Sequence, residues 1–196
     1  LEENVKKFIH DDPFLLVTSH RRENILNKIS LKNIVDLINS SDKKVLFPMG
    51  YATQRQIREF GLNLNKNVLV IDPIGYLEFI YLLKKSQYCI SDSGTVIEEA
   101  CILNIPSIQM RYSTERPEVY EVGSSIKFDP TLEGQNLEEI HYLADSLNNT
   151  KWSHPFGDGK SSEILVNDLI DLARNNEFNM HKKEDYDFDI SRSFLK

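Results

Sequence analysis

Short apolar runs alternate with amphipathic stretches along most of this chain, from residue 14 to about residue 174. This alternation is typical of βαβ units, in which parallel strands are joined by helices that pack on the sheet. Right-handed crossovers then place helices on both faces. The pattern therefore predicts an α/β fold with a doubly wound, parallel, Rossmann-like sheet.

Two sets of segments carry this prediction. Continuous apolar runs, which suit strands buried on both faces, predict strands at residues 14–19, 45–47, 68–71, 88–91, 107–110 and 125–128. Apolar residues at helical spacing predict helices at residues 29–38, 53–60, 76–85, 96–103, 137–147 and 161–173. We expect Pro48 to stop the second strand and Gly61 to end a helix in a left-handed conformation.

The composition changes at about residue 174. Residues 1–174 are predicted to form one Rossmann-like domain, and residues 175–196 a polar C-terminal tail. Two interpretations of the tail are open: it is disordered, or its aromatic side chains dock on a surface that this chain lacks. Those aromatic residues are Phe178, Tyr186, Phe188 and Phe194.

The charge balance narrows the class of ligand. A net charge of −7 argues against a protein that coats nucleic acid or an anionic membrane. No apolar segment approaches the roughly 20 residues that span a bilayer. Cys89 and Cys101 lie in apolar patterns without zinc-ligand spacing, so we expect two buried thiols and a reducing cytoplasm. An acidic chain that binds an anion must gather its cations at one place.

The first cationic cluster directly follows the first predicted strand, at the end of the sheet where ligands bind in this fold class. Residues 19–24 (S-H-R-R-E-N) place His20, Arg21 and Arg22 in a row. Guanidinium groups donate several hydrogen bonds to phosphate, and a histidine adds another donor. The alternative is a solvated loop in which Arg22 pairs with Glu23.

A second segment, residues 91–99 (S-D-S-G-T-V-I-E-E), joins the fourth strand to a helix that opens near Thr95. Unpaired amides and the positive end of the helix dipole bind phosphate there, and Gly94 permits a tight turn. Ser93 and Thr95 add hydroxyl donors. The spacing of Thr95 and the glutamate three residues later also fits a capping box, which is the competing role. Glu99 is positioned to accept hydrogen bonds from a ribose diol.

Two later segments are also candidates for binding an anion. Residues 110–118 (M-R-Y-S-T-E-R-P-E) contain Arg111 and Arg116, which could face a diphosphate, and we expect one of them to be paired with a glutamate of this segment. Residues 155–163 (P-F-G-D-G-K-S-S-E) superficially suggest a phosphate loop. Their spacing is not that of a Walker motif and no strand precedes them, so a turn at a helix start is predicted.

In this order, the segments resemble motifs of the non-hydrolysing UDP-N-acetylglucosamine 2-epimerases. The family patterns are T-x-H-R-R-E-N, D/E-P-x-x-Y-L-x-F, D-S-G-[GT]-x-x-E-E, M-R-x-x-T-E-R-P-E and P-[YF]-G-D-G-K-x-x-E. They are matched by residues 18–24, 72–79, 92–99, 110–118 and 155–163. The resemblance covers roughly residues 10–175, and the ordered set is far more specific than any one motif.

The resemblance implies the C-terminal half of a glycosyltransferase-B type architecture. The implied reaction interconverts UDP-GlcNAc and UDP-ManNAc by eliminating UDP and adding it back. Its proton-transfer carboxylates come mainly from the N-terminal domain, so this chain alone is expected to be inactive. The implied partners are UDP or a UDP-sugar and that missing domain, with no metal, cofactor, nucleic acid or membrane.

The resemblance also implies particular site residues. The strip around Phe79 contacts the uracil, residues 93–95 hold the diphosphate, and Glu99 binds the ribose. His20 and Arg116 contact phosphate near the reacting sugar. The implied catalytic residues are His20 and Arg116, and the implied substrate-binding residues are Arg21, Phe79, Ser93, Gly94, Thr95 and Glu99.

The chain departs from the family pattern at two places. Members usually carry F-P-x-H where residues 47–50 read F-P-M-G, a region that borders a regulatory UDP-GlcNAc site in bacterial relatives. Thr95 replaces the usual second glycine, a substitution that is also compatible with relatives that epimerise modified sugars. The alternatives are an epimerase of another UDP-2-acetamido sugar, a hydrolysing epimerase, a glycosyltransferase, and a degenerate binding or interaction domain. The complete T-E-R-P-E motif argues against the second, and H-R-R-E-N against the third.

Overall fold

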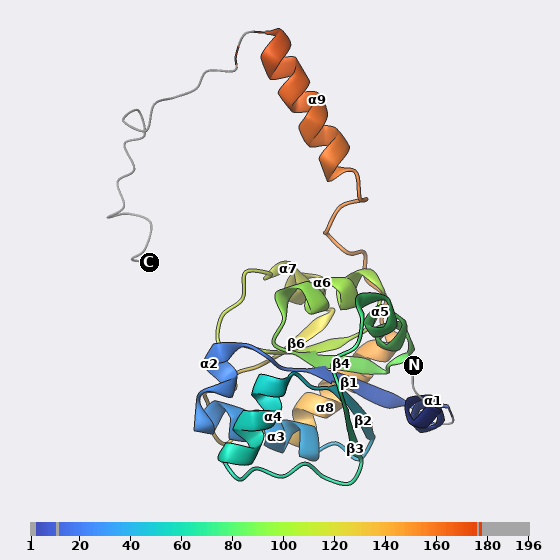
Figure 1. Cartoon of the computed structure of the whole chain (residues 1–196). Helices are drawn as coiled ribbons and strands as arrows, with labels where there is room; N and C mark the ends of the chain where they lie inside the picture. The colour runs from blue at the N-terminus through green and yellow to red at the C-terminus, as the bar shows by residue number, and fades with distance from the viewer. Residues whose placement is uncertain (1–2, 11, 176, 178–196) are drawn as a thin grey trace, which may run out of the picture. The chain divides into compact units, whose positions relative to one another are not determined.

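The computed structural model describes residues 3–10, 12–175 and 177. Its strands form one sheet in the spatial order β3-β2-β1-β4-β5-β6, and all of the pairings are parallel (Figure 1). The prediction of an α/β fold with a doubly wound, Rossmann-like sheet is therefore confirmed. The strands are β1 (Phe14–Thr18), β2 (Lys44–Pro48), β3 (Val68–Ile71), β4 (Tyr88–Ser91), β5 (Ser107–Met110) and β6 (Ser125–Phe128).

Side chains of the central strands enter two separate hydrophobic layers, because successive residues of a strand point to opposite faces. Leu15 and Val17 of β1 belong to one layer, whereas Phe14 and Leu16 belong to the other. All four are at most 2% exposed. This burial on both faces is why the strand reads as a continuous apolar run rather than an alternating one.

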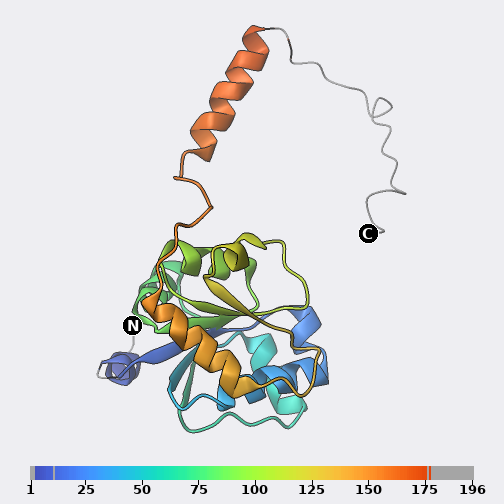
Figure 2. The ribbon, with the colours of Figure 1, turned by 180° about the vertical axis from the view of Figure 1, so that it is seen from behind.

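Helices cover both faces of the sheet, as Figures 1 and 2 show from opposite sides. One layer holds buried side chains of α3, α4 and α8, and the other holds those of α5 and α6. The predicted helices agree with the observed ones to within two residues at each end. The helices are α1 (Glu3–Ile9), α2 (Arg22–Ile25), α3 (Lys28–Asn39), α4 (Tyr51–Glu59), α5 (Tyr76–Lys85), α6 (Gly94–Ile102), α7 (Glu118–Glu121), α8 (Leu137–Ser146) and α9 (Ser161–Arg174), with a 3-10 turn at Leu147–Asn149.

Two one-turn helices escape prediction from the sequence. Both α2 and α7 are four residues long, too short to show the spacing that identifies a helix. Pro48 is the last residue of β2 instead of the residue that follows it. Gly61 has a φ of 67°, so the left-handed conformation predicted for this helix end is confirmed.

The chain forms two compact units, one that ends at Phe156 and one that begins at Gly157. In the second unit, α9 begins at Ser161 after two glycines with positive φ. The helix-start turn predicted for residues 155–163 is thus confirmed. The predicted domain boundary after residue 174 stays a prediction. The aromatic residues of the predicted tail, Phe178, Tyr186, Phe188 and Phe194, lie outside the described residues.

A buried histidine joins α8 to the sheet and to α3. His141 is 8% exposed, and its Nδ1 lies 2.7 Å from the Tyr88 hydroxyl. Its Nε2 lies 2.9 Å from the Leu37 carbonyl oxygen. Because a carbonyl can only accept, Nε2 carries the proton of the neutral ring and Nδ1 accepts from the tyrosine. Burial is the main cause that lowers the pKa of His141, and the Leu37 carbonyl partly opposes it.

This histidine should make the fold sensitive to mild acid. Since the folded-state pKa of His141 is lowered, stabilisation present above the unfolded pKa of about 6.5 is lost as the pH falls below it. We expect the free energy of unfolding in urea to fall more steeply between about pH 7.5 and 5.5 for the natural chain than for His141→Gln. Glutamine keeps a donor for the Leu37 carbonyl but does not titrate. Equal slopes for the two proteins would contradict this role.

Candidate functional site

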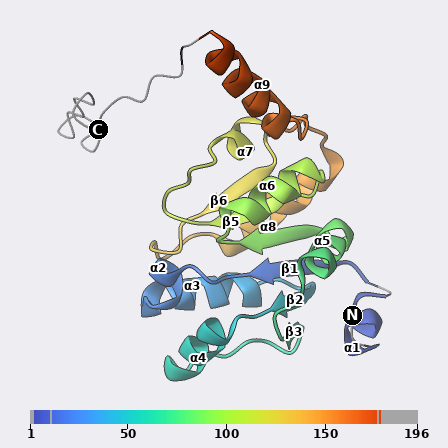
Figure 3. The ribbon, with the colours of Figure 1, turned by 45° about the horizontal axis from the view of Figure 1, so that its top comes forward.

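The carboxyl ends of β1 and β4 lie side by side at the centre of the sheet, where the strand order reverses. Thr18 is level with Ser91, so the segments after both strands emerge together. Figure 3 shows α2 beyond the carboxyl end of β1. In open α/β sheets this reversal point is where ligands bind.

A buried carboxylate fixes the loop after β1 to the turn after β4. Asp92 is fully buried and accepts hydrogen bonds from four groups of that loop. The donors are Ser19 Oγ at 2.9 Å, the His20 amide at 3.1 Å, the Arg21 amide at 3.0 Å and Asn24 Nδ2 at 3.2 Å. A buried carboxylate is stable only when donors surround it in this way. Sequence reasoning gave Asp92 no role, although an aspartate directly after a buried strand was a usable signal.

The loop that Asp92 holds is anchored at both ends. Ser19 and Asn24 are 2% and 4% exposed, whereas His20, Arg22 and Glu23 between them are exposed, so the middle of the loop is solvated. Asn24 Nδ2 also donates to the Met110 carbonyl oxygen at 3.1 Å, which joins the ends of β1, β4 and β5. The ion pair of Glu23 is formed with Arg21, at 3.9 Å, and not with the neighbouring arginine as the alternative of a solvated loop required.

The start of α6 presents backbone amides at the same edge. Ser93 is the N-cap, and its Oγ accepts a hydrogen bond from the Val96 amide at 3.5 Å. The capping box considered for Thr95 and Glu98 is therefore wrong, because the cap lies two residues before Thr95. Glu98 instead binds the guanidinium of Arg116. The amides and dipole at this helix start remain suited to an anion.

A hollow of about 470 Å³ lies next to this helix start. Four of the predicted site residues line it: His20, Phe79, Thr95 and Glu99. The other lining residues are Thr18, Pro48, Gly50, Pro73, Ile74, Tyr76 and Val96. Hydrogen bonding to the Glu99 carboxylate raises the pKa of the Tyr76 phenol, so this pair forms one polar position in a largely apolar wall. Such a wall suits a flat ring with an attached sugar.

The other four predicted residues lie outside the lining of this hollow: Arg21, Ser93, Gly94 and Arg116. Arg21 Nη2 lies 3.3 Å from Glu115 Oε1, and Arg111 Nη1 lies 2.5 Å from Glu115 Oε2. The predicted pairing of one arginine with a glutamate of its own segment is thus confirmed for Arg111. Arg116, whose side chain is 39% exposed, pairs with Glu98 of α6.

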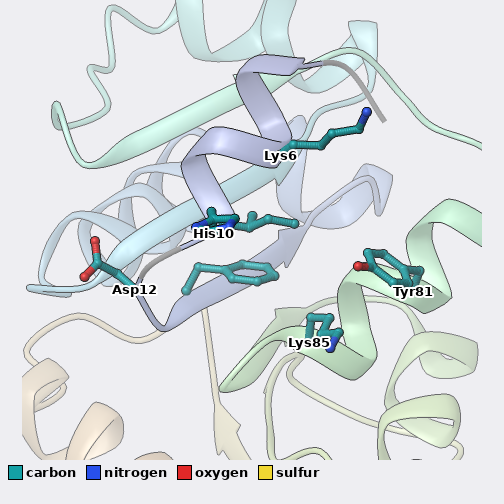
Figure 4. A pocket seen from close by; sticks show the side chains of 7 residues that line it. Lys6, His10, Asp12, Tyr81 and Lys85 are labelled. Atoms are coloured by element: carbon teal, nitrogen blue, oxygen red, sulfur yellow. The ribbon is translucent and has the colours of Figure 1, made fainter.

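A larger hollow, of about 580 Å³, lies elsewhere in the same unit. Lys6 and His10 approach it from α1 and the residue after it, and Tyr81 and Lys85 from α5 (Figure 4). It also contacts Phe14, the first residue of β1, and so lies at the amino end of that strand. No predicted site residue lines it. Size therefore does not decide between the two hollows, whereas position in an α/β sheet favours the smaller one.

Within residues 3–10, 12–175 and 177, no group of three or more His, Cys, Asp or Glu side chains could hold a metal ion. Over the same residues, no helix is both long and apolar enough to cross a membrane. Cys89 and Cys101 are each 1% exposed, as predicted, and burial raises the pKa of Cys89 to about 12. That thiol is therefore poorly suited to act as a nucleophile.

The sheet order and the site at its reversal point define a Rossmann-like α/β domain that forms one half of a glycosyltransferase-B type architecture. The family model described as UDP-N-acetylglucosamine 2-epimerase matches residues 1–170. The chain therefore belongs to the UDP-N-acetylglucosamine 2-epimerase family.

Individual relatives agree with this assignment. The chain is 42% identical, over 178 residues, to the UDP-N-acetylglucosamine 2-epimerase of Methanocaldococcus jannaschii, covering 84% of this chain and 47% of that protein. A crystal structure of the M. jannaschii enzyme with UDP-GlcNAc and UDP matches at a TM-score of 0.70 and 41% identity, over 86% of this chain and 49% of that one. The UDP-2,3-diacetamido-2,3-dideoxy-D-glucuronate 2-epimerase of Pseudomonas aeruginosa is 38% identical over 118 residues, 59% of this chain and 33% of that protein.

The chain is shorter than the relatives that it matches. The chain spans about half the length of the curated UDP-N-acetylglucosamine 2-epimerases that it matches. The matched region contains the strands, the Asp92 network and the hollow at the start of α6. The family assignment therefore rests on about half the length of these enzymes.

Proposed function

We propose that this chain is the UDP-sugar-binding half of a non-hydrolysing UDP-N-acetylglucosamine 2-epimerase and is inactive without an N-terminal half. The observation that carries the proposal is the grouping of His20, Phe79, Thr95 and Glu99 around one hollow at the sheet reversal point. In support, a relative with 41% identity has a structure described with UDP-GlcNAc and UDP.

Each part of the proposed ligand has a matching surface. The apolar wall that includes Phe79 would take the uracil, and Glu99 would accept hydrogen bonds from the ribose hydroxyls. The Ser93 and Thr95 hydroxyls and the amides at the start of α6, with Gly94 between them, would hold the diphosphate. Arg21 would add its guanidinium at the same edge. This assignment gives the uracil to the apolar wall and the diphosphate to the hydrogen-bond donors.

The proposed reaction breaks the C1–O bond to UDP while a base removes the C2 proton. The products are a 2-acetamidoglucal and UDP, and re-addition after protonation on the opposite face gives the C2 epimer. Departure of UDP requires cations and donors that stabilise the leaving diphosphate, a role that we assign to His20 and Arg116. The proton transfers at C2 require positioned acids and bases, which we assign mainly to the missing half.

Binding of UDP tests this proposal directly. We expect saturable binding by the 196-residue chain in calorimetry, weakened about tenfold or more by Arg116→Ala and by Glu99→Ala. Arg55→Ala is a matched control for the arginine, because Arg55 is exposed on α4 and pairs only loosely, at 3.8 Å, with Glu59. A folded chain without affinity for UDP, or equal losses in the control, would refute the proposed site.

The inactivity of the isolated half is tested by NMR of UDP-GlcNAc. We expect no UDP-ManNAc from this chain alone, and epimerisation when the N-terminal half of the M. jannaschii relative is added. Turnover by the chain alone would refute the assignment of the proton-transfer groups to the other half. UDP-2,3-diacetamido sugars form the second candidate substrate class, because the P. aeruginosa relative is named for one.

A further inference from the structure

A glutamate side chain lies against the start of α6. Gly94, the first residue of that helix, is buried, and a Cβ added there would lie 2.9 Å from Glu115 Oε1. Outside the helix itself, the nearest group to this Cβ position is a carboxylate from the loop after β5, and a helix start attracts an anion of this kind.

The same carboxylate binds two arginines of the site edge. Glu115 Oε1 faces Arg21 Nη2 at 3.3 Å, and Glu115 Oε2 faces Arg111 Nη1 at 2.5 Å. A phosphate group bound at this helix start would need the same elements: the amide end of a helix and guanidinium donors. The hydrogen bond from its own amide, and then the contacts with Arg111 and Arg21, lower the pKa of Glu115, so the group is charged at neutral pH.

We propose that the Glu115 carboxylate is an internal substitute for phosphate, which occupies the diphosphate position at the start of α6 and must leave when UDP binds. The inference rests on the proposed function, because its ligand is UDP. It assigns to Glu115 a lowering of the affinity for UDP, whereas the site arginines raise that affinity. Arg21 and Arg111 exchange one anionic partner for another on binding. The net affinity for UDP is therefore lower than the donors alone would give.

Replacing this carboxylate tests the inference. Glu115→Gln keeps the size of the side chain and removes the charge, and we expect it to bind UDP and inorganic pyrophosphate about tenfold more tightly than the natural chain. Binding of uridine, followed by NMR, should change less than about twofold, because uridine has no phosphate. A melting curve checks that the variant is folded, which is expected since the Glu115 side chain is 47% exposed.

Glu23→Gln is the matched control. It removes a carboxylate that also lies near Arg21, at 3.9 Å, but is not among the nearest atoms to Gly94. We expect less than about a threefold change in affinity for UDP from this variant. Unchanged or weaker binding by Glu115→Gln would overturn the inference and make Glu115 a residue that orients the arginines. Pyrophosphate distinguishes failure of the proposed function from failure of this inference. If neither the natural chain nor Glu115→Gln binds UDP, the proposed function fails. The inference fails if Glu115→Gln does not bind pyrophosphate more tightly than the natural chain does.

Discussion

Asp92→Ala should lower the free energy of unfolding by about 4 kcal/mol and the melting temperature by about 10 °C. The side chain is fully buried, and its carboxylate is the shared acceptor for Ser19, the His20 and Arg21 amides and Asn24. Alanine would leave these donors without that partner. Each buried donor left unpaired costs about 1–3 kcal/mol, so a large sum is expected even if some of them find other acceptors.

Two further variants make this prediction specific. Asparagine in Asp92→Asn has nearly the same shape, but its NH2 group would face groups that are themselves donors. We therefore expect the free energy of unfolding to fall by about 2 kcal/mol. Asp42→Ala removes a carboxylate whose side chain is 96% exposed, and it should change stability by less than about 0.5 kcal/mol. Urea unfolding measures all three. A loss below about 1 kcal/mol for Asp92→Ala would show that the loop after β1 is held by other contacts.

Much of the fold could be predicted because buried parallel strands read as uninterrupted apolar runs. The bounds of β3, β4, β5 and β6 coincide with the predicted ones, and α5 matches at both ends. The one-turn helices α2 and α7 could not be found, since four residues do not establish a helical period. Local periodicity thus identifies the longer elements and misses the one-turn helices, although Ile25 of α2 and Val119 of α7 also pack into the core.

The site was less predictable, because its contacts join segments far apart in the sequence. The donors to Asp92 lie between 68 and 73 residues before it, and they meet it only because β1 and β4 are neighbours. The pairing of Glu98 with Arg116 was missed for a similar reason: local spacing favoured a cap, whereas the loop after β5 brings a cation to α6. Arg111 was simpler, since its partner is four residues away.

Gly94→Val should lower the affinity for UDP at least about a hundredfold while the chain stays folded, with Gly94→Ala intermediate. The added side chain would fill the position at the start of α6 that the diphosphate is proposed to occupy. The atom it meets first is Glu115 Oε1, at 2.9 Å from the new Cβ. That atom is the far end of a flexible side chain, so the fold can adapt at a cost of about 1 kcal/mol.

Variants at Gly94 and Glu115 distinguish a steric effect on UDP binding from an electrostatic one. Gly94→Val and Glu115→Gln act on the same few ångströms of space, yet the first should weaken binding and the second should strengthen it. Gly75→Ala is the control, because Gly75 is the N-cap of α5, which also follows a strand, and its new Cβ would meet only Glu78, at an ordinary 3.5 Å. Calorimetry with UDP on the three variants gives the comparison. If Gly94→Val binds UDP as well as the natural chain does, the diphosphate does not approach the start of α6. The arginines that bind it would then be others than Arg21 and Arg111, which contact Glu115.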